Sequence, residues 1–466
     1  MHSSPTYPTH SAETGCEGCL APYRVDTPID AVGRYGRMFD LPALVIDEAI
    51  VRRVGAAGGF CDSSAENPAD SESDAYAGTG ASGATRDARV EAGWPFFGQY
   101  VAHDLTADRS PLTTSAELEA LANLRSARAN LEPLYGPGPA GSPYLYDRGD
   151  PAKLLDFDGD VPRNHEGTAI IVDPRNDSHI FMSQLQVALI RAHNRIVDRL
   201  RAEGADDHTV FQDAQLTLTW HYQWVIVNEF LPQLAGRELV NAILACGSRF
   251  YRPEGAPLIP VEFADAAYRY GHSQIRETYL LRPGREPVRF FPDLLGFGPV
   301  GDRKVDWTLF FDVPGHQQAQ RCKPIDGRLV SSLISLPQAI SGEVSHAAYA
   351  SLAARDLQRG CGLGLPSGES VARLIGAEVL SEDELGLSRV GWSGQTPLWM
   401  YIQREAACRH AGNRLGEVGG TIIAEVLIGI ISRDPESYLA LDPGWRPTLP
   451  ARDGGFKLRD LLIETV

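Results

Sequence analysis

Two histidines, an arginine and a glutamine, spread over three distant segments, are the residues of this chain best suited to chemistry. His103 follows Gln99 by four residues, so both side chains share one face if the segment is helical. Arg175 lies in a polar segment, and His272 stands in a stretch rich in tyrosine. One imidazole can accept and return a proton, a guanidinium can stabilise a developing anion, and a second imidazole can bind iron. Together these groups could support peroxide cleavage at a haem iron.

Each of these residues, taken singly, also has an ordinary structural interpretation. A lone histidine on a helix is more often hydrogen-bonded structure than a ligand, and a lone arginine in a turn is more often on the surface. The ordered set favours the chemical interpretation. We expect structural or exposed roles for the remaining histidines that lack such a setting, which are His165, His179, His193, His208, His221, His316, His346 and His410.

The size and charge of the chain restrict the class of partner. Its 466 residues, 43% of them hydrophobic, are enough to bury a large core and a cofactor. The formal net charge of -17 repels phosphate backbones and anionic lipid, so we expect neither nucleic acid nor a membrane surface as partner. The apolar stretch around residues 422–431 falls short of the roughly 18 residues of a membrane span.

The N-terminal residues and the cysteines indicate a reducing compartment. The first twenty residues lack the positive start and apolar run of a secretory signal, so we expect a cytoplasmic protein. Seven scattered cysteines suit reduced thiols. Cys16 and Cys19 have the spacing of a metal or redox pair, but no second such pair completes a four-ligand site, and free thiols are the simpler expectation.

The domain organisation follows from composition and periodicity. Residues 60–88 are rich in Ser, Ala, Asp, Gly and Glu without any period, which predicts a flexible loop. Residues 1–90 are therefore predicted to be an N-terminal arm with that acidic loop. Residues 91–466 are predicted to form one large, mainly α domain with few short strands.

Four helices are predicted from apolar spacing and end signals. They are expected at residues 182–201, at 209–235 with Gly236 as the stop, from the Thr396–Pro397 pair to Gly412, and from about Thr421 to the break at Asp434–Pro435. Thr396 is the expected N-cap of the third helix.

The three chemical segments resemble those of the animal-type haem peroxidase family, also called the peroxidase-cyclooxygenase superfamily, over roughly residues 91–432. The family's distal-helix motif matches Gln99, His103 and Asp104. Arg175 matches its catalytic arginine, and His272 matches its iron ligand. The resemblance implies a helical fold, a haem cofactor, and hydrogen peroxide as substrate together with a small organic donor.

A further stretch resembles the family's proximal motif, in which an asparagine hydrogen-bonds the iron-ligating imidazole. This chain has Asp356 at that place, and a carboxylate there would give His272 imidazolate character and favour ferric iron. The resemblance also makes Arg359 and Arg269 candidate partners of the haem propionates, with surface salt bridges as the alternative.

A calcium site is implied by the same resemblance. In the family, the aspartate after the distal histidine joins a loop of oxygen donors that stands before a Tyr-Gly pair. The corresponding residues here are Asp104, Ser126, Arg128 through its carbonyl, Asn130 and Glu132. Asn130 replaces an aspartate and lowers the negative charge, which weakens affinity for calcium.

Departures from the family pattern refine the expectation. The positions whose carboxylates bind haem covalently in the mammalian enzymes hold Ala102 and Ser178, and His179 stands where some relatives have a methionine that forms a further bond. The resemblance is therefore to a bacterial-like member that holds haem b noncovalently, and chloride oxidation is disfavoured. Arg269 occupies the place of the cyclooxygenase radical tyrosine, although Tyr268 and Tyr270 lie beside it.

Three functions remain open from the sequence. The first is a haem peroxidase that reduces hydrogen peroxide with an organic, aromatic donor, as in a response to oxidative stress. The alternative is a haem-dependent oxygenase of a lipid or secondary metabolite. The third is a haem-free helical interaction protein, which is disfavoured because unused buried polar groups cost stability.

Overall fold

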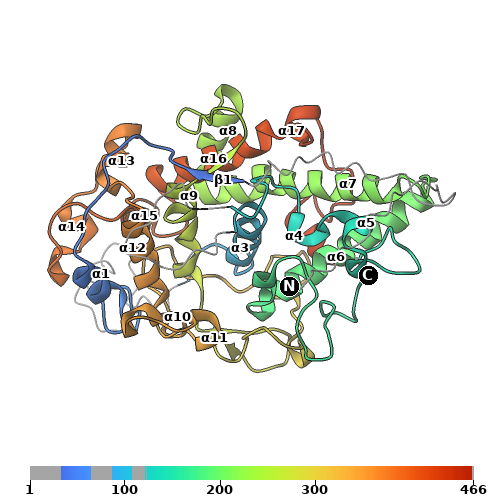
Figure 1. Ribbon diagram of the computed structural model, residues 1–466, viewed down its shortest axis with the longest axis horizontal. Coiled ribbons are helices and arrows are strands. Elements are labelled where there is room, and N and C mark those ends of the chain that lie inside the picture. Colours follow the sequence, from blue (N-terminus) through green and yellow to red (C-terminus); the bar gives the residue numbers. More distant parts are fainter. Residues whose placement is uncertain (1–32, 65–86, 108–120, 122, 464–466) are drawn as a thin grey trace, which may run out of the picture.

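The computed structural model describes residues 33–64, 87–107, 121 and 123–463, and within them helices dominate. Figure 1 shows α3 (Trp94–Leu105) near the centre, with α6 and α7 to one side of it and α12 to α15 to the other. The predicted mainly α fold is confirmed. The helices are α1 (Glu48–Gly55), α3, α4 (Glu132–Tyr135), α5 (Gly138–Gly141), α6 (Ile180–Ala202), α7 (Val210–Val225), α8 (Arg237–Cys246), α9 (Val261–Ala264), α10 (Ser331–Ile334), α11 (Gln338–Ser341), α12 (Leu352–Gly362), α13 (Gly368–Ile375), α14 (Glu382–Leu385), α15 (Leu398–His410), α16 (Glu417–Arg433), α17 (Tyr438–Leu441) and α18 (Leu458–Leu462).

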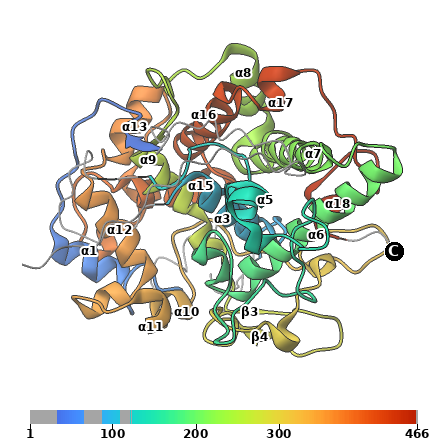
Figure 2. The same ribbon diagram turned by 45° about the vertical axis from the view of Figure 1, so that its right-hand side comes forward.

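The strands are few and short, as predicted. β1 (Arg34–Gly36) pairs in parallel with β2 (Leu258–Pro260), and β3 (Thr278–Tyr279) pairs antiparallel with β4 (Val288–Arg289). Figure 2 shows β3 and β4 at the edge of the molecule. Short 3-10 helices connect the larger elements: η3 (Pro143–Leu145), η4 (Pro174–Asp177), η7 (Ala267–Gln274), η8 (Gly301–Arg303), η9 (Trp307–Leu309), η10 (Ala347–Ala350) and η11 (Ser388–Val390).

The N-terminal arm and the acidic loop fall largely outside the described residues. Residues 1–32 and 65–86 are not among those described, and they include Cys16, Cys19 and most of the predicted loop at 60–88. Within the part of the chain that is described, no helix is both long and apolar enough to cross a membrane.

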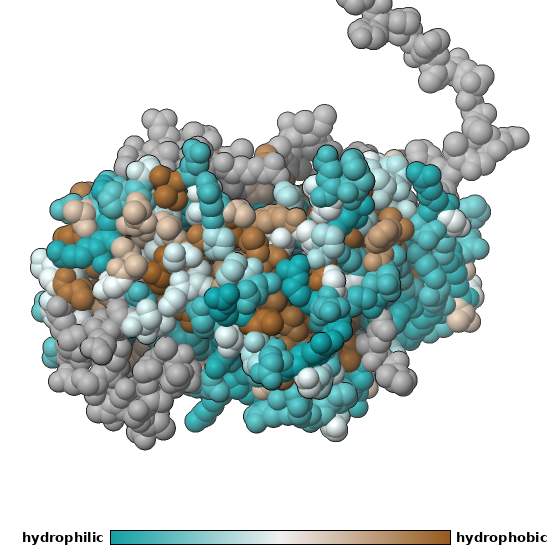
Figure 3. Space-filling model, turned by 90° about the horizontal axis from the view of Figure 1, so that it is seen from below, coloured by the Kyte–Doolittle hydropathy of each residue, from teal (hydrophilic) through white to brown (hydrophobic). Residues whose placement is uncertain are grey.

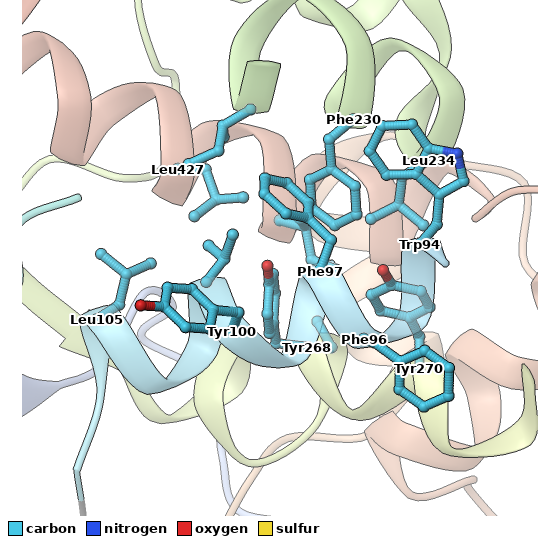
Figure 4. Packing of buried hydrophobic residues seen from close by; sticks show 14 of the residues in the cluster. Trp94, Phe96, Phe97, Tyr100, Leu105, Phe230, Leu234, Tyr268, Tyr270 and Leu427 are labelled. Carbon is cyan, nitrogen blue, oxygen red and sulfur yellow. The ribbon is translucent and has the colours of Figure 1, made fainter. Parts of the chain in front are cut away.

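The core surrounds α3, whose residues are buried on nearly every side. Pro95 stands in the first turn, where backbone N–H groups have no partner within the helix, so the N–H that proline lacks is not missed. The helix ends at Thr106, whose hydroxyl donates to the carbonyl of Ala102. Figure 4 shows the aromatic side chains of α3 packed against Phe230 and Tyr270. Because α3 lies inside aromatic packing, its cavity-facing side is held in place by large buried side chains.

The predicted helix at 182–201 is confirmed as α6, and the next one is confirmed only in part. After Val225 the helix continues as two π-helical segments, η5 (Ile226–Phe230) and η6 (Pro232–Gly236). Pro232 lacks the N–H that an α-helix needs at that place, which accounts for the wider turns. The chain does break at Gly236, with φ of 95°, and α8 begins at the next residue.

The two helices predicted nearest the C-terminus are confirmed as α15 and α16. The predicted N-cap of α15 and the predicted first residue of α16 are wrong. Pro397, and not Thr396, is the N-cap of α15, and the Thr396 hydroxyl has no hydrogen-bond partner among the described residues. α16 begins four residues before the predicted Thr421, because the Glu405 carboxylate of α15 accepts the N–H of Val418 at 3.0 Å. A cap supplied by another helix leaves no local signal in the sequence.

The segment that carries Arg175 is held by a close backbone contact with residues 296–297. Phe297 N–H donates to the carbonyl of Asp177 at 2.8 Å, and Gly296 N–H donates to that of Ser178 at 3.1 Å. A Cβ at position 296 would collide with the carbonyl oxygen of Asp177, so only glycine fits there.

Gly296→Ala should therefore lower the free energy of unfolding by about 1–3 kcal/mol, because the backbone on one side must move. The urea midpoint measures the effect. Gly298→Ala is the matched control, since its added Cβ meets open space within 4 Å. Equal midpoints for the two variants would contradict the packing argument.

Candidate active site

One cavity collects the predicted chemical residues. Its volume is about 320 Å³, and Gln99, His103, Arg175, Arg269 and His272 all line it. Its apolar wall includes residues around α10 and α11, and Figure 3 looks onto the face that carries these helices, where hydrophobic side chains gather between hydrophilic ones. We call this space the histidine cavity. Its apolar lining comprises Phe263, Ile275, Phe290, Phe291, Leu333, Leu336, Ile340 and Leu352.

His103 lies on α3 with 7% of its surface exposed, and its ring is held by a buried hydrogen-bonded chain. His103 Nδ1 lies 2.7 Å from Asn176 Oδ1, and Asn176 Nδ2 donates to Gln186 Oε1 at 3.1 Å. The Tyr100 hydroxyl donates to the same Gln186 oxygen at 2.9 Å. Gln186 Nε2 donates to the carbonyl of Pro133 at 3.2 Å, so the chain ends on a group that can only accept.

That terminal carbonyl sets the direction of every bond in the chain. It fixes the Gln186 amide nitrogen toward Pro133, which turns the Gln186 oxygen toward Asn176 and the Asn176 oxygen toward His103. His103 must then carry its proton on Nδ1, and Nε2 is left as a bare acceptor. Burial, followed by the charge of Arg175, lowers the pKa of His103 to about 3, so the ring is neutral near pH 7 and its Nε2 carries no proton.

Arg175 is held by its partners on one side and left open on the other. Its Nη2 donates to Asp173 Oδ2 at 2.6 Å and to the carbonyls of Thr106 and His103 at 2.6 Å and 3.1 Å, and its Nε donates to Asp173 at 3.0 Å. Nη1 makes no hydrogen bond to a described residue. The guanidinium therefore presents one free donor group in the cavity beside His103.

Asp173 binds two guanidinium groups at once. Its Oδ2 lies 2.6 Å from Arg175 Nη2 and 2.5 Å from Nη2 of Arg125, and the carboxylate is only 2% exposed. Burial alone would raise the pKa of Asp173, but the hydrogen bonds and charges of Arg175 and Arg125 outweigh it and hold that pKa below its ordinary value. The carboxylate thus stays charged and keeps Arg175 oriented.

Gln99 is oriented by His179, for which the sequence predicted only a structural or exposed role. His179 Nε2 lies 3.0 Å from Gln99 Oε1, and burial lowers the pKa of His179 to about 3. The neutral ring therefore donates from Nε2 to the Gln99 oxygen, which leaves the Gln99 amide hydrogens free as donors. His179 lines the histidine cavity together with Gln99.

A row of alternating charges lies behind His272. His272 Nδ1 lies 2.6 Å from Asp356 Oδ2, and the other oxygen of this fully buried carboxylate accepts from Arg269 Nη1 at 3.1 Å. Arg269 Nη2 donates to Asp265 at 2.9 Å, and Arg359 Nε lies 3.4 Å from the same Asp265 oxygen. His272 Nε2 is left available to the cavity. Arg269 lines the cavity, whereas Arg359 does not.

The residues expected to bind calcium form a loop whose carboxylates already have protein donors. Asp104 accepts the N–H groups of Leu131 and Glu132 at 3.0 Å and 2.9 Å. Glu132 accepts from Arg125 Nη1 at 2.9 Å and from Ser126 N–H at 3.2 Å.

The other predicted donors of this loop are only partly engaged, and Ser126 Oγ is buried without a hydrogen-bond partner among the described residues. Asn130 accepts from Glu132 N–H at 3.2 Å, and the Arg128 side chain binds Asp434 and Glu436. Among the described residues, no cluster of three or more His, Cys, Asp or Glu side chains could hold a metal. The positive charge of Arg125 beside Glu132 disfavours a dication with the side chains as they lie, and calcium at this loop stays a prediction.

Comparison with known proteins identifies the family of the chain. The model of the animal haem peroxidase family matches residues 152–382, which include Arg175, His272 and Asp356 but begin after α3. The chain belongs to this family. The family model therefore matches a shorter range than residues 91–432, over which the sequence predicted the resemblance.

Curated relatives of the family are similar over part of their length. Chorion peroxidase of Drosophila melanogaster is 31% identical over 222 residues, which cover 46% of this chain and 27% of that protein. A peroxidase of the same species is 38% identical over 112 residues, which cover 22% of this chain and 16% of the relative. The chain therefore spans about a quarter or less of the length of these relatives.

Solved structures share the fold at low identity. Peroxidase A from Dictyostelium discoideum has a TM-score of 0.57 at 15% identity, covering 77% of this chain and 81% of that one. Fatty acid alpha-dioxygenase from Oryza sativa has a TM-score of 0.58 at 16% identity, covering 87% and 81%. At this identity the likeness establishes the fold alone.

Sequence reasoning missed the residues that hold the others in place. Asn176 and Asp173 flank Arg175 closely in sequence, so their role could have been suspected from that position. Gln186 lies further along the chain, on α6, where nothing in the sequence links it to Arg175. Pro133 takes part through its backbone carbonyl, so its residue type does not reveal the contact. A contact made through a backbone carbonyl leaves no signal in the residue types of a sequence.

Asn176→Asp should raise the pKa of His103, because a carboxylate would then face the Nδ1–H and favour the charged ring. NMR titration of the His103 ring in the purified protein measures this shift, and Asn413→Asp, outside the cavity lining, is the charge control. An unchanged His103 titration in Asn176→Asp would remove Asn176 from this role.

Proposed function

We propose that this protein is a haem-dependent peroxidase that reduces hydrogen peroxide with an organic, aromatic electron donor. One observation carries the proposal: two imidazoles and a guanidinium from distant segments line one cavity, and Nε2 of both His103 and His272 is free of hydrogen bonds to described residues. Family membership supports the haem, and the peroxidase names of the relatives support the reaction.

The residues present suit noncovalently held haem b. The cavity volume falls within the roughly 300–1,000 Å³ typical of cofactor and ligand sites. His272 is the proposed iron ligand, and its Nδ1 bond to a carboxylate is the usual second interaction of a metal-bound imidazole. Ala102 and Ser178 line the cavity without a carboxylate that could form an ester. The proposal does not depend on calcium, since the two carboxylates among its expected ligands, Asp104 and Glu132, already accept hydrogen bonds from the protein.

Three side chains would handle the peroxide. When bound, haem supplies the redox chemistry that cleaves the O–O bond. His103 Nε2 accepts a proton from one peroxide oxygen and returns it to the other. The free Nη1 of Arg175 stabilises the negative charge on the departing oxygen, and the Gln99 amide hydrogens hold the peroxide or a water beside His103.

The apolar wall of the cavity favours an aromatic donor. Phe290 and Phe291 lie in the lining with their ring centroids 4.4 Å apart, and leucine and isoleucine side chains continue the wall. Such a surface binds flat apolar molecules, and a donor that carries a charge would need a polar site outside this cavity.

His103→Ala and Arg175→Ala should each slow the change that peroxide causes in the haem absorption spectrum by about 100-fold, since each removes a group acting on the reacting oxygens. Stopped-flow absorption measures this rate. His316→Ala and Arg148→Ala, both exposed, are the matched controls. A rate equal to that of the controls would exclude the residue concerned from the reaction.

Asp356→Asn should raise the reduction potential of the bound iron by tens of millivolts, because the variant loses the negative charge beside His272. Spectroelectrochemical titration measures the potential. Asp265→Asn removes the same charge but does not contact His272, and serves as control. A potential that moves equally in both variants would contradict a direct effect on the imidazole.

An oxygenase is the second candidate, and the fold shared with the plant alpha-dioxygenases favours it. Against it, position 269 holds an arginine bound to two carboxylates, and the Tyr268 hydroxyl has no proton acceptor among the described residues. Incorporation of labelled dioxygen into a product without added peroxide would establish the oxygenase. A haem-free scaffold would be recognised by the lack of a Soret band after reconstitution with haem.

A further inference from the structure

A second cavity lies on the other side of the start of α3. Its volume is about 390 Å³, and the π-helical segments, residues near Phe311 and the C-terminal residues 455–459 form its walls. Glu91, Glu229, Phe311, Phe456 and Arg237 are among its lining residues. None of them lines the histidine cavity.

Trp94 lies next to lining residues of both cavities, although it lines neither. Its indole is 3% exposed, and its Nε1–H donates to Oε2 of Glu91 at 2.8 Å, so the tryptophan is bonded to the wall of the second cavity. Its ring packs edge-on against Phe311 with centroids 5.4 Å apart. The next residue, Pro95, lines the histidine cavity.

Aromatic rings continue from Trp94 toward the histidine cavity. Phe230 stacks on Trp94 with centroids 5.9 Å apart and an angle of 24° between the rings. The Phe230 ring and the Tyr270 hydroxyl both come close to Gly98, which lines the histidine cavity along with Tyr270. Figure 4 shows Trp94, Phe230, Phe97 and Tyr270 in one group beside α3.

The side chains of the second cavity favour a ligand with a proton-donating group at one end and a negative charge at the other. Glu229 accepts Leu458 N–H with Oε2 at 2.7 Å, and its other oxygen makes no hydrogen bond to a described residue. Burial raises the pKa of Glu229 to about 7, which makes it able to take up a proton near neutral pH. Arg237 is exposed and pairs with no described carboxylate. Lys457 and Arg459, the latter paired with Asp453, add further positive charge to the lining.

We propose that the second cavity binds a phenol carrying a carboxylate, and that Trp94 passes electrons from this donor to the haem of the histidine cavity. The ring would lie against Phe456 and Phe311, the hydroxyl would donate to Glu229, and the carboxylate would face Arg237. This inference rests on the proposed peroxidase function and assigns a separate site to its electron donor.

The electrons and protons balance over two identical steps. In each, Trp94 loses one electron to the peroxide-oxidised haem and its Nε1 proton to Glu91. The phenol then loses one electron to Trp94 and its hydroxyl proton to Glu229, which releases that proton to solvent, while Glu91 returns its proton to the indole. Two donor molecules thus supply the two electrons and two protons that convert hydrogen peroxide to two waters.

Radical detection on the haem-loaded protein tests the relay without relying on turnover. After peroxide is added without a donor, electron paramagnetic resonance should detect a tryptophan radical. The signal should be lost in Trp94→Phe and kept in Trp392→Phe, whose indole also donates a hydrogen bond, but to the carbonyl of Gln395, a residue that lines neither cavity. An identical radical signal in Trp94→Phe would overturn the relay.

Steady-state kinetics test the donor site with a variant that should fold normally. Arg237→Ala should raise KM for 4-hydroxycinnamate about threefold more than KM for 4-methylphenol, since only the former carries a carboxylate for the arginine. Equal effects on both donors would overturn the proposed binding mode. If peroxide leaves the haem spectrum of the unaltered protein unchanged, the peroxidase proposal itself fails; a normal spectral response with an unaltered Trp94→Phe signal refutes the relay alone.

Discussion

The buried carboxylate of Asp173 ties together the segments on which the candidate site depends. It binds Arg175 on one side and Arg125 on the other, and both guanidinium groups also donate to the carbonyl of His103. One carboxylate thereby fixes η4, the end of α3 and the loop before α4 relative to one another. A buried charge left without its partner is costly, so loss of any one of these residues would disturb the others.

The two sides of the histidine cavity differ in charge, and this difference supports the proposed roles. On the side of His103 the imidazole is neutral and a guanidinium supplies positive charge, which suits departure of an anion. On the side of His272 a carboxylate faces the imidazole, and the charge of that carboxylate is shared with Arg269. Asp356 therefore exerts a weaker effect on His272 than an unshared carboxylate would.

The parts of this fold that were predictable from the sequence were those with a periodic or local signal. α6 follows the spacing of its apolar residues, and α15 and α16 were placed within a few residues. The π-helical turns after Val225 were not predicted, because apolar periodicity does not distinguish them from a regular helix. The start of α16 depends on Glu405 from another helix, and no local pattern records such a cap.

For the candidate site, residue types indicated the chemistry, whereas the orientation of the side chains depends on the folded chain. His103, Arg175, Gln99 and His272 were selected by type and spacing, and all of them line one cavity. Their protonation and direction depend on Asn176, Gln186, His179 and the Pro133 carbonyl. These partners act through the shape of the folded chain, which spacing along the sequence does not encode.

Burial of neutral imidazoles also makes the stability of this protein sensitive to acid. The pKa is lowered to about 3 in His103 and His179 and to about 4 in His193 and His221, chiefly by burial. In the unfolded chain the histidine pKa is near the ordinary value of about 6.5, so below that pH the unfolded chain binds protons that the folded state does not bind. The contribution of these rings to stability is therefore complete above that value and falls as the pH drops toward 4. Acidification would favour the unfolded chain by protonating four separate imidazoles, and each of them must lose its proton again when the chain refolds.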